Sequence, residues 1–113
     1  MAFYVYILEC ANGRYYTGYA ADLEKRFEQH LSGRGGAKFT RAFPPHKMLA
    51  AWEVAGTKGD AMRIEALIKS KTRDEKKALI QNPSVLDIIL LEKFPAKQFS
   101  AVLYSFDIKI SNK

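Results

Sequence analysis

The sequence predicts a small α+β domain. A three-stranded antiparallel sheet is flanked by helices, and a further helix and strand are added at the C-terminal end. Three observations support this class. A chain of 113 residues has the length of one domain. Two runs rich in β-branched and aromatic residues, 3–10 and 14–19, flank Asn12-Gly13, a dipeptide typical of hairpins. Segments with helical periodicity and capping signals then follow.

The connection between the first two strands decides where two tyrosines point. A two-residue turn would place Tyr6 and Tyr16 on opposite faces of the sheet, because side chains alternate along a strand. A three-residue loop over 11–13, with its glycine in a left-handed bulge, would instead pair Cys10 with Arg14. Both tyrosines then share one face. We predict this bulged loop, because a common active site needs both hydroxyls on the same side.

The first helix is expected over residues 23–32. Asp22 is a suitable N-cap, and Gly33 is a suitable stop. Apolar residues every four positions predict a buried stripe made of Leu23, Phe27 and Leu31. Arg26 and His30 are also four residues apart, and we expect them beside this stripe, at the seam between the helix and the sheet.

A glycine-rich basic loop is expected over residues 33–47. It carries Arg34, Lys38 and Arg41 and contains no acidic residue. The whole chain has a net charge of +6 and a pI of about 9.5, which favours binding of polyanions such as nucleic acid. The loop is either a solvated connector or a phosphate-binding segment, and we favour the second.

The remaining elements are predicted from apolar runs, caps and prolines. An apolar run predicts a third strand, Thr57-x-x-Asp60 resembles a helix start, and Thr72-x-x-Glu75 is a capping box. The expected elements are a strand over 48–55, a helix from 57 to about 70, a helix from 73 to 82, a helix from 84 to 93 and a strand over 99–110. We divide the chain into a domain over 1–82 and an extension over 83–113 that packs on the same domain.

Two short motifs and three single residues resemble a known family when they are taken in order: Tyr4-Val5-Tyr6, Tyr16-Thr17-Gly18, Arg26, His30 and Glu65. The chain resembles the GIY-YIG nuclease family, and most of all its small stand-alone bacterial members. In that family, two tyrosine motifs lie on adjacent strands, an arginine lies on the next helix and a glutamate lies on a later helix. The first motif departs from the family pattern, because Tyr4 stands where the family has glycine.

The resemblance implies hydrolysis of phosphodiester bonds with one divalent ion, Mg²⁺ or Mn²⁺, held by Glu65. It implies that Tyr16 is the candidate base for the attacking water and that Arg26 binds the scissile phosphate. Tyrosine is a weak base at neutral pH, and a nearby cation would favour its phenolate form. By the same resemblance, Tyr6 positions water or bonds to Tyr16, and His30 moves a proton or contacts phosphate.

Each candidate also has an ordinary structural interpretation. Tyrosines on half-buried strands are common sheet residues. Composition alone favours a surface role for Arg26, and His30 is nearly as well suited to capping the end of its helix as to a functional role. Glu65 and Lys69 have the spacing of a routine helical ion pair. Alternatively, Lys69 contacts a phosphate while Glu65 holds the metal.

The predicted function is a metal-dependent endonuclease acting on branched, flapped or nicked DNA in repair or recombination. The alternatives are a DNA- or RNA-binding module that cuts poorly or not at all, and an interaction domain that uses the apolar C-terminal segment. A single cysteine, the lack of a signal-peptide pattern and the short apolar runs favour the cytoplasm without membrane association. We expect a monomer, or a weak dimer formed through the C-terminal extension.

Overall fold

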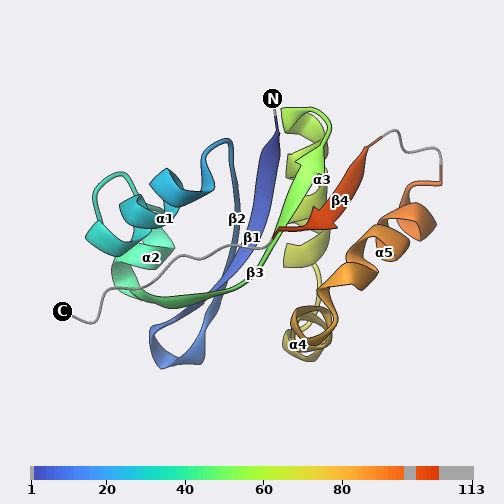
Figure 1. Ribbon diagram of the computed structural model, residues 1–113. Helices are drawn as coiled ribbons and strands as arrows, with labels where there is room; N and C mark the ends of the chain where they lie inside the picture. The colour runs from blue at the N-terminus through green and yellow to red at the C-terminus, as the bar shows by residue number, and fades with distance from the viewer. Residues whose placement is uncertain (1, 96–98, 105–113) are drawn as a thin grey trace.

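A computed structural model describes residues 2–95 and 99–104 of the chain. It contains a four-stranded antiparallel sheet in the order β2-β1-β3-β4, with α1 and α2 on one side and α3, α4 and α5 on the other (Figure 1). The elements are β1 (Phe3–Cys10), η1 (Ala11–Gly13), β2 (Tyr15–Ala20), α1 (Leu23–Ser32), α2 (Lys38–Ala42), β3 (Pro45–Ala55), α3 (Lys58–Lys69), α4 (Arg73–Gln81), η2 (Pro83–Val85), α5 (Leu86–Lys93) and β4 (Ser100–Leu103).

The hairpin of β1 and β2 has the predicted register. Leu8 lies opposite Tyr16, and Tyr6 lies opposite Gly18. Because side chains alternate along each strand, Tyr6 and Tyr16 lie on the same face of the sheet. This is the face that α1 and α2 cover, so the first helix packs directly beside the two tyrosines.

The hairpin loop has three residues, as predicted. The Cys10 N–H donates to the Arg14 carbonyl oxygen at 2.7 Å, which closes the loop. Gly13 is left-handed with φ 70°, and Asn12 is left-handed as well with φ 64°, which the prediction did not include. Asn12 and Gly13 form a tight turn, in which the Arg14 N–H donates to the Ala11 carbonyl at 3.5 Å. Both Cys10 and Ala11 thus lie opposite Arg14, and Ala11 is the extra residue of the bulge.

Helix α1 has the predicted bounds, but the predicted stripe was wrong at its last position. The Asp22 carboxylate accepts from the backbone N–H of residue 25 at 3.1 Å, and Gly33 is the left-handed C-cap. Leu31 is 41% exposed, whereas His30 is 1% exposed and completes the buried stripe. Seven residues make almost two turns, so position 30 lies nearly above Leu23, whereas position 31 is turned away by about 80°.

The segment 33–47 is not the continuous loop that was predicted. It contains the short helix α2, whose Thr40 side chain is buried against α1. The Phe39 ring also packs inward, against Phe43 at 5.1 Å between ring centroids. Strand β3 begins at Pro45, earlier than predicted. The basic side chains of Lys38 and Arg41 therefore lie on a helix that packs against α1 and leads directly into β3.

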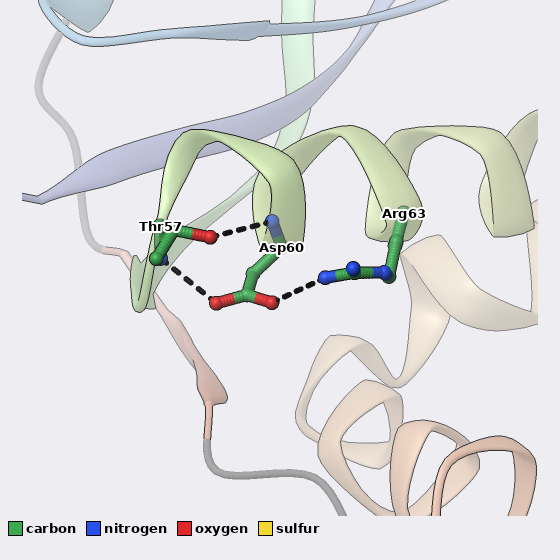
Figure 2. Close-up of polar contacts among 3 residues, drawn as sticks. All are labelled: Thr57, Asp60 and Arg63. Atoms are coloured by element: carbon green, nitrogen blue, oxygen red, sulfur yellow. Dashed lines mark hydrogen bonds and ion pairs between the residues drawn. The ribbon is translucent and has the colours of Figure 1, made fainter.

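Helices α3 and α4 begin where the sequence predicted a helix start and a capping box, and both starts form capping boxes. At the start of α3, the Thr57 hydroxyl accepts from the Asp60 N–H at 3.1 Å, and the Asp60 carboxylate accepts from the Thr57 N–H at 2.8 Å (Figure 2). The same carboxylate pairs with Arg63 at 2.6 Å. Thr72 and Glu75 make the equivalent reciprocal contacts at the start of α4. These caps bond N–H groups that the first turn of a helix leaves without partners.

The prediction of a three-stranded sheet was wrong, because β4 joins the sheet as a fourth strand. It pairs antiparallel with β3, so that Trp52 lies opposite Leu103. The predicted strand over 99–110 is thus observed as Ser100–Leu103, and its positions 105–110 lie outside the described residues. Strand β4 joins because Ala101 is buried in the core between the sheet and α5.

The last helix starts two residues later than predicted. Ser84 lies in the 3-10 turn η2, and α5 begins at Leu86. Asp87, in the first turn of α5, accepts a hydrogen bond from the Ala101 N–H of β4 at 3.2 Å. The indole of Trp52 donates to the Pro83 carbonyl at 2.8 Å, so the sheet also holds the start of this segment.

Each side of the sheet has its own buried core. The larger core lies under α3, α4 and α5, and the smaller core lies under α1 and α2. The larger includes Val5, Ile7, Trp52, Ile64, Ile68, Leu86 and Leu90, and the smaller includes Tyr6, Leu8, Leu23 and Phe27. None of the helices in the described part of the chain is long and apolar enough to cross a membrane.

Candidate active site

A pocket of about 430 Å³ opens around the edge strand β2. Residues from several elements line it: Phe3, Tyr16, Tyr19, Ala21, Arg26, Lys58 and Glu65. Tyr16 and Arg26 come from the side of the sheet that α1 covers, whereas Glu65 comes from α3 on the other side. The pocket therefore extends across the open edge of the sheet. It brings together three of the predicted site residues.

Tyr16 is held by rings on three sides. Its ring stacks on Phe39 with 5.8 Å between centroids and meets the His30 ring edge-on at 5.1 Å. The Tyr6 ring lies 6.3 Å away in a tilted arrangement. The Tyr16 side chain itself is only half-buried and lines the pocket. Its orientation is thus fixed by packing while its surface stays accessible.

Tyr6 lies beneath the pocket and does not line it. Its side chain is 1% exposed, and its hydroxyl bonds to Nε2 of His30 at 2.8 Å, not to Tyr16. The ring passes directly over Gly18, where a Cβ atom would be 2.6 Å from the Tyr6 hydroxyl oxygen. Gly18 is needed here for close approach. Burial, together with neighbouring Tyr16, raises the pKa of Tyr6 well above its usual range, so its hydroxyl stays protonated.

His30 is a buried neutral residue, not the helix cap that was one alternative. Its Nδ1 lies 2.7 Å from the Thr40 hydroxyl, so both ring nitrogens have side-chain partners. Burial, and then the charge of Arg26, lower its pKa to about 4. Because it is 1% exposed, His30 supports the tyrosines and does not face the pocket.

Arg26 is anchored at the pocket by two hydrogen bonds from Nη1. One goes to the Gly35 carbonyl at 2.7 Å, and the other goes to the Gln29 side-chain oxygen at 3.0 Å. These bonds restrict the guanidinium, which reduces the entropy lost when it binds an anion. The close approach of segment 33–37 to α1 also depends on Gly36, where a Cβ atom would be 2.9 Å from the Gln29 carbonyl oxygen.

Glu65 supplies the carboxylate of the pocket. Its side chain is 17% exposed, and it pairs with Lys69 at 3.5 Å. Over residues 2–95 and 99–104, no group of three or more His, Cys, Asp or Glu side chains could hold a metal. Among the residues that line the pocket, Glu65 thus supplies the one carboxylate that could bind a metal ion. It fits Mg²⁺, which often binds one or two carboxylates and otherwise takes waters and substrate phosphate oxygens.

The basic residues predicted to bind nucleic acid lie outside the pocket. Arg34, Lys38 and Arg41 are exposed along the segment between α1 and β3. Lys69 is exposed next to Glu65 on α3, as the ion pair shows. Tyr4, which replaces the family glycine, packs edge-on against Tyr104 at 4.9 Å and likewise does not line the pocket.

Several residues at this site were not identified from the sequence, and Phe39, Thr40 and Lys58 matter most because they contact Tyr16 or His30 or bring charge to the pocket. Phe39 and Thr40 lie on α2. This helix has only five residues and no capping signal, so the sequence did not predict it. Lys58 could have been identified from its spacing to Glu65. It lies seven positions before Glu65, which is almost two turns, so both side chains project from the same face of α3.

Residues 2–78 match the family model of the GIY-YIG catalytic domain. A UPF0213 protein of Streptococcus agalactiae serotype V is 47% identical over 78 residues, which cover 69% of this chain and 86% of that protein. Another, of Halalkalibacterium halodurans, is 44% identical over 80 residues, covering 71% and 83%. The solution NMR structure of a UPF0213 protein from Bacillus halodurans is 43% identical, covers 72% of this chain and 84% of that chain, and gives a TM-score of 0.46. The family resemblance inferred from the sequence is therefore confirmed, and the chain belongs to the GIY-YIG catalytic-domain family.

Proposed function

We propose that this protein is a divalent-metal-dependent endonuclease that hydrolyses DNA phosphodiester bonds. One observation carries the proposal: a single pocket collects Tyr16 from β2, Arg26 from α1 and Glu65 from α3. A nuclease-family catalytic domain implies a nucleic-acid substrate. These three side chains supply a hydroxyl, a planar cation and a carboxylate, which are the groups that phosphodiester hydrolysis uses.

The proposed roles follow from the position of each group. Arg26 binds a phosphate oxygen through its fork of N–H donors and stabilises the negative charge of the transition state. Tyr16 orients the attacking water and accepts its proton. Glu65 would hold one Mg²⁺ or Mn²⁺, which when bound supplies positive charge to the phosphate and lowers the pKa of water. Lys58 adds positive charge at the same pocket. Tyr6 and His30, assigned by resemblance to direct roles, act from beneath Tyr16 because neither lines the pocket.

The proposed substrate is DNA of irregular structure, with RNA as the alternative. Arg34, Lys38, Arg41 and Lys69 are exposed and are assigned to backbone phosphates. Phosphate contacts position a protein on a duplex without reading its sequence. We therefore propose cleavage at branched, flapped or nicked DNA, in repair or recombination in the cytoplasm. The acting form would be a monomer, or a weak dimer through the C-terminal extension.

One observation favours a second candidate, a nucleic-acid-binding module that does not cut. The Glu65 carboxylate is paired with Lys69 at 3.5 Å, and an ammonium in that position competes with a metal ion. The two candidates share the basic surface and differ only in cleavage. A cleavage assay therefore distinguishes them.

Labelled duplex, flap and four-way-junction DNA should be cut in Mg²⁺ or Mn²⁺, and a chelator should stop the reaction. Tyr16→Phe should lower the cleavage rate by roughly 100-fold or more, because it removes the oxygen that accepts the proton. Tyr15→Phe is the matched control. Tyr15 is the preceding residue, lies on the opposite face of the sheet and stacks under Arg73 at 4.2 Å. Cleavage by Tyr16→Phe at the wild-type rate would remove Tyr16 from the mechanism, and no cleavage of any substrate would favour the binding module.

DNA affinity should fall steeply with salt, because binding displaces counterions from phosphates. Each of Arg34→Ala, Lys38→Ala and Arg41→Ala should reduce the slope of log K against log salt by about 0.9 if one phosphate contact is lost. Fluorescence anisotropy at several salt concentrations measures this slope. Lys93→Ala is the control, since Lys93 is exposed on α5, on the other side of the sheet. An unchanged slope in all three variants would place the DNA elsewhere.

A further inference from the structure

Helix α2 has one exposed basic side and one side that packs into the molecule. Lys38 and Arg41 are exposed, whereas Phe39 and Thr40 point into the molecule. The Phe39 ring stacks on Tyr16, and the Thr40 hydroxyl contacts His30, whose ring in turn meets Tyr16 edge-on. Four consecutive residues thus connect an exposed basic surface to the surroundings of one pocket residue.

The direction of each hydrogen bond in this region follows from counting donors. The Thr40 hydroxyl lies 3.0 Å from the Ala37 carbonyl oxygen, which accepts only, so the single hydroxyl proton of Thr40 is used there. Thr40 must then accept from His30, which requires a proton on Nδ1. A neutral imidazole carries a proton on only one of its nitrogens, so Nε2 is unprotonated and accepts a hydrogen bond from the Tyr6 hydroxyl at 2.8 Å.

The protonation states agree with this chain of bonds. Burial lowers the pKa of His30 to about 4, so the ring is neutral at neutral pH. Burial also raises the pKa of Tyr6, which keeps its hydroxyl as a donor. The Tyr6–His30 and His30–Thr40 bonds are buried, where the alternative of bonding to water is lost, and the Thr40–Ala37 bond is partly buried.

The chain of bonds ends at the neighbours of Tyr16. The Tyr6 ring is fixed over Gly18, beside the Tyr16 ring. The His30 ring is fixed edge-on to Tyr16 by its two bonds. Loss of the Thr40 hydroxyl would leave the Nδ1 proton of His30 without a partner, and the proton would move to Nε2. Nε2 would then donate to the Tyr6 oxygen, and the Tyr6 hydroxyl would lose the acceptor for its own proton.

We propose that Thr40 is a positioning residue of this active site: it selects the Nδ1–H tautomer of His30, and through His30 and Tyr6 it fixes the orientation of Tyr16 at the pocket. The proposal rests on the proposed nuclease function. Because Thr40 lies between Lys38 and Arg41 on one short helix, the same element binds the DNA backbone and orients the pocket tyrosine.

The test compares Thr40→Val, which removes the hydroxyl at nearly constant shape, with Thr40→Ser, which keeps it. Thr17→Val is the matched control. Thr17 is also buried, at 3% exposure, and its hydroxyl has no hydrogen-bond partner among the residues that the structure describes. Thr40→Val should lower kcat by about 10- to 100-fold, as loss of an outer supporting bond typically does. Its KM for DNA should change little, because Lys38 and Arg41 remain. Thr40→Ser should recover most of the rate.

Nitrogen-15 NMR of the imidazole gives a readout that does not depend on cleavage. Wild type should show a protonated Nδ1 and a bare Nε2 for His30, and Thr40→Val should shift the proton toward Nε2. A wild-type Nε2–H tautomer would overturn the proposal. So would a folded Thr40→Val that cuts as fast as Thr17→Val. Wild-type protein that cuts no substrate would instead refute the nuclease function, and with it the positioning role, whatever the tautomer.

Discussion

Replacing Glu65 with glutamine should abolish cleavage and leave the fold intact. Glutamine keeps the size of the side chain but removes the charge that a hard divalent ion requires. Loss of the metal's contribution, worth several kcal/mol, corresponds to a rate decrease of more than about 1,000-fold. The ion pair with Lys69 is lost too, but a helical pair of this kind contributes only about 0.5 kcal/mol. The melting temperature should therefore change little.

Binding of Mn²⁺ gives a second readout of the same substitution. The paramagnetic ion should broaden backbone NMR signals of α3 and β2 in wild type, and this broadening should vanish in Glu65→Gln. The control is Asp60→Asn, which also neutralises a carboxylate of α3 paired with a cation, Arg63 at 2.6 Å (Figure 2). Asp60→Asn should weaken the helix cap by about 1 kcal/mol and keep cleavage. Equal cleavage in wild type and Glu65→Gln would dismiss Glu65 as the metal ligand.

Gly18→Ala should reduce cleavage by about 100-fold or more, because displacement of catalytic groups by about 1 Å has effects of that size. A Cβ atom at position 18 would be 2.6 Å from the Tyr6 hydroxyl oxygen and 2.9 Å from Cε2 of Tyr16. The Tyr6 ring is 1% exposed and bonded to His30, so it cannot move aside freely. The methyl group should therefore break that hydrogen bond and displace both tyrosines. Overpacking of this kind destabilises a protein by about 1–3 kcal/mol.

Urea unfolding and the cleavage assay measure the two effects of Gly18→Ala separately. Gly59→Ala is the same chemical change at a harmless position in α3, where the new Cβ would be 3.6 Å from its nearest neighbour, the Thr57 hydroxyl. It should stabilise the protein by roughly 0.5 kcal/mol, because alanine is the better helix former. Wild-type stability and activity in Gly18→Ala would show that Tyr6 can occupy another position without consequence.

The hairpin and the capped helices could be predicted because their signals are local. The Asn12-Gly13 turn and the requirement that Tyr6 and Tyr16 share a face gave the register that the structure has. The starts of α3 and α4 were visible as a helix-start pattern and a capping box, each contained in four residues. A local signal of this type does not depend on where the rest of the chain lies.

The errors concern features that only tertiary packing determines. The last strand was predicted, but its place in the sheet beside β3 was not, because it depends on the burial of Ala101 in the core under α5. His30 lies in the core because Thr40 and Tyr6 bond to both of its nitrogens, and Thr40 lies on the short helix α2, which the sequence did not predict. The spacing of His30 from Arg26 had predicted a position beside the buried stripe, at the seam between the helix and the sheet.

The position of the pocket also has a consequence for aggregation. Strand β2 is at the edge of the sheet, and the pocket opens around it, with groups from both faces. At the other edge, β4 covers β3, but a strand or helix laid along β2 would close the pocket. Unpaired strand edges are sites where chains join one another, and proteins protect them with short strands and charge. Here β2 has six residues and is followed by a helix bearing Arg26. Access for substrate and resistance to self-association thus make opposite demands on the same strand.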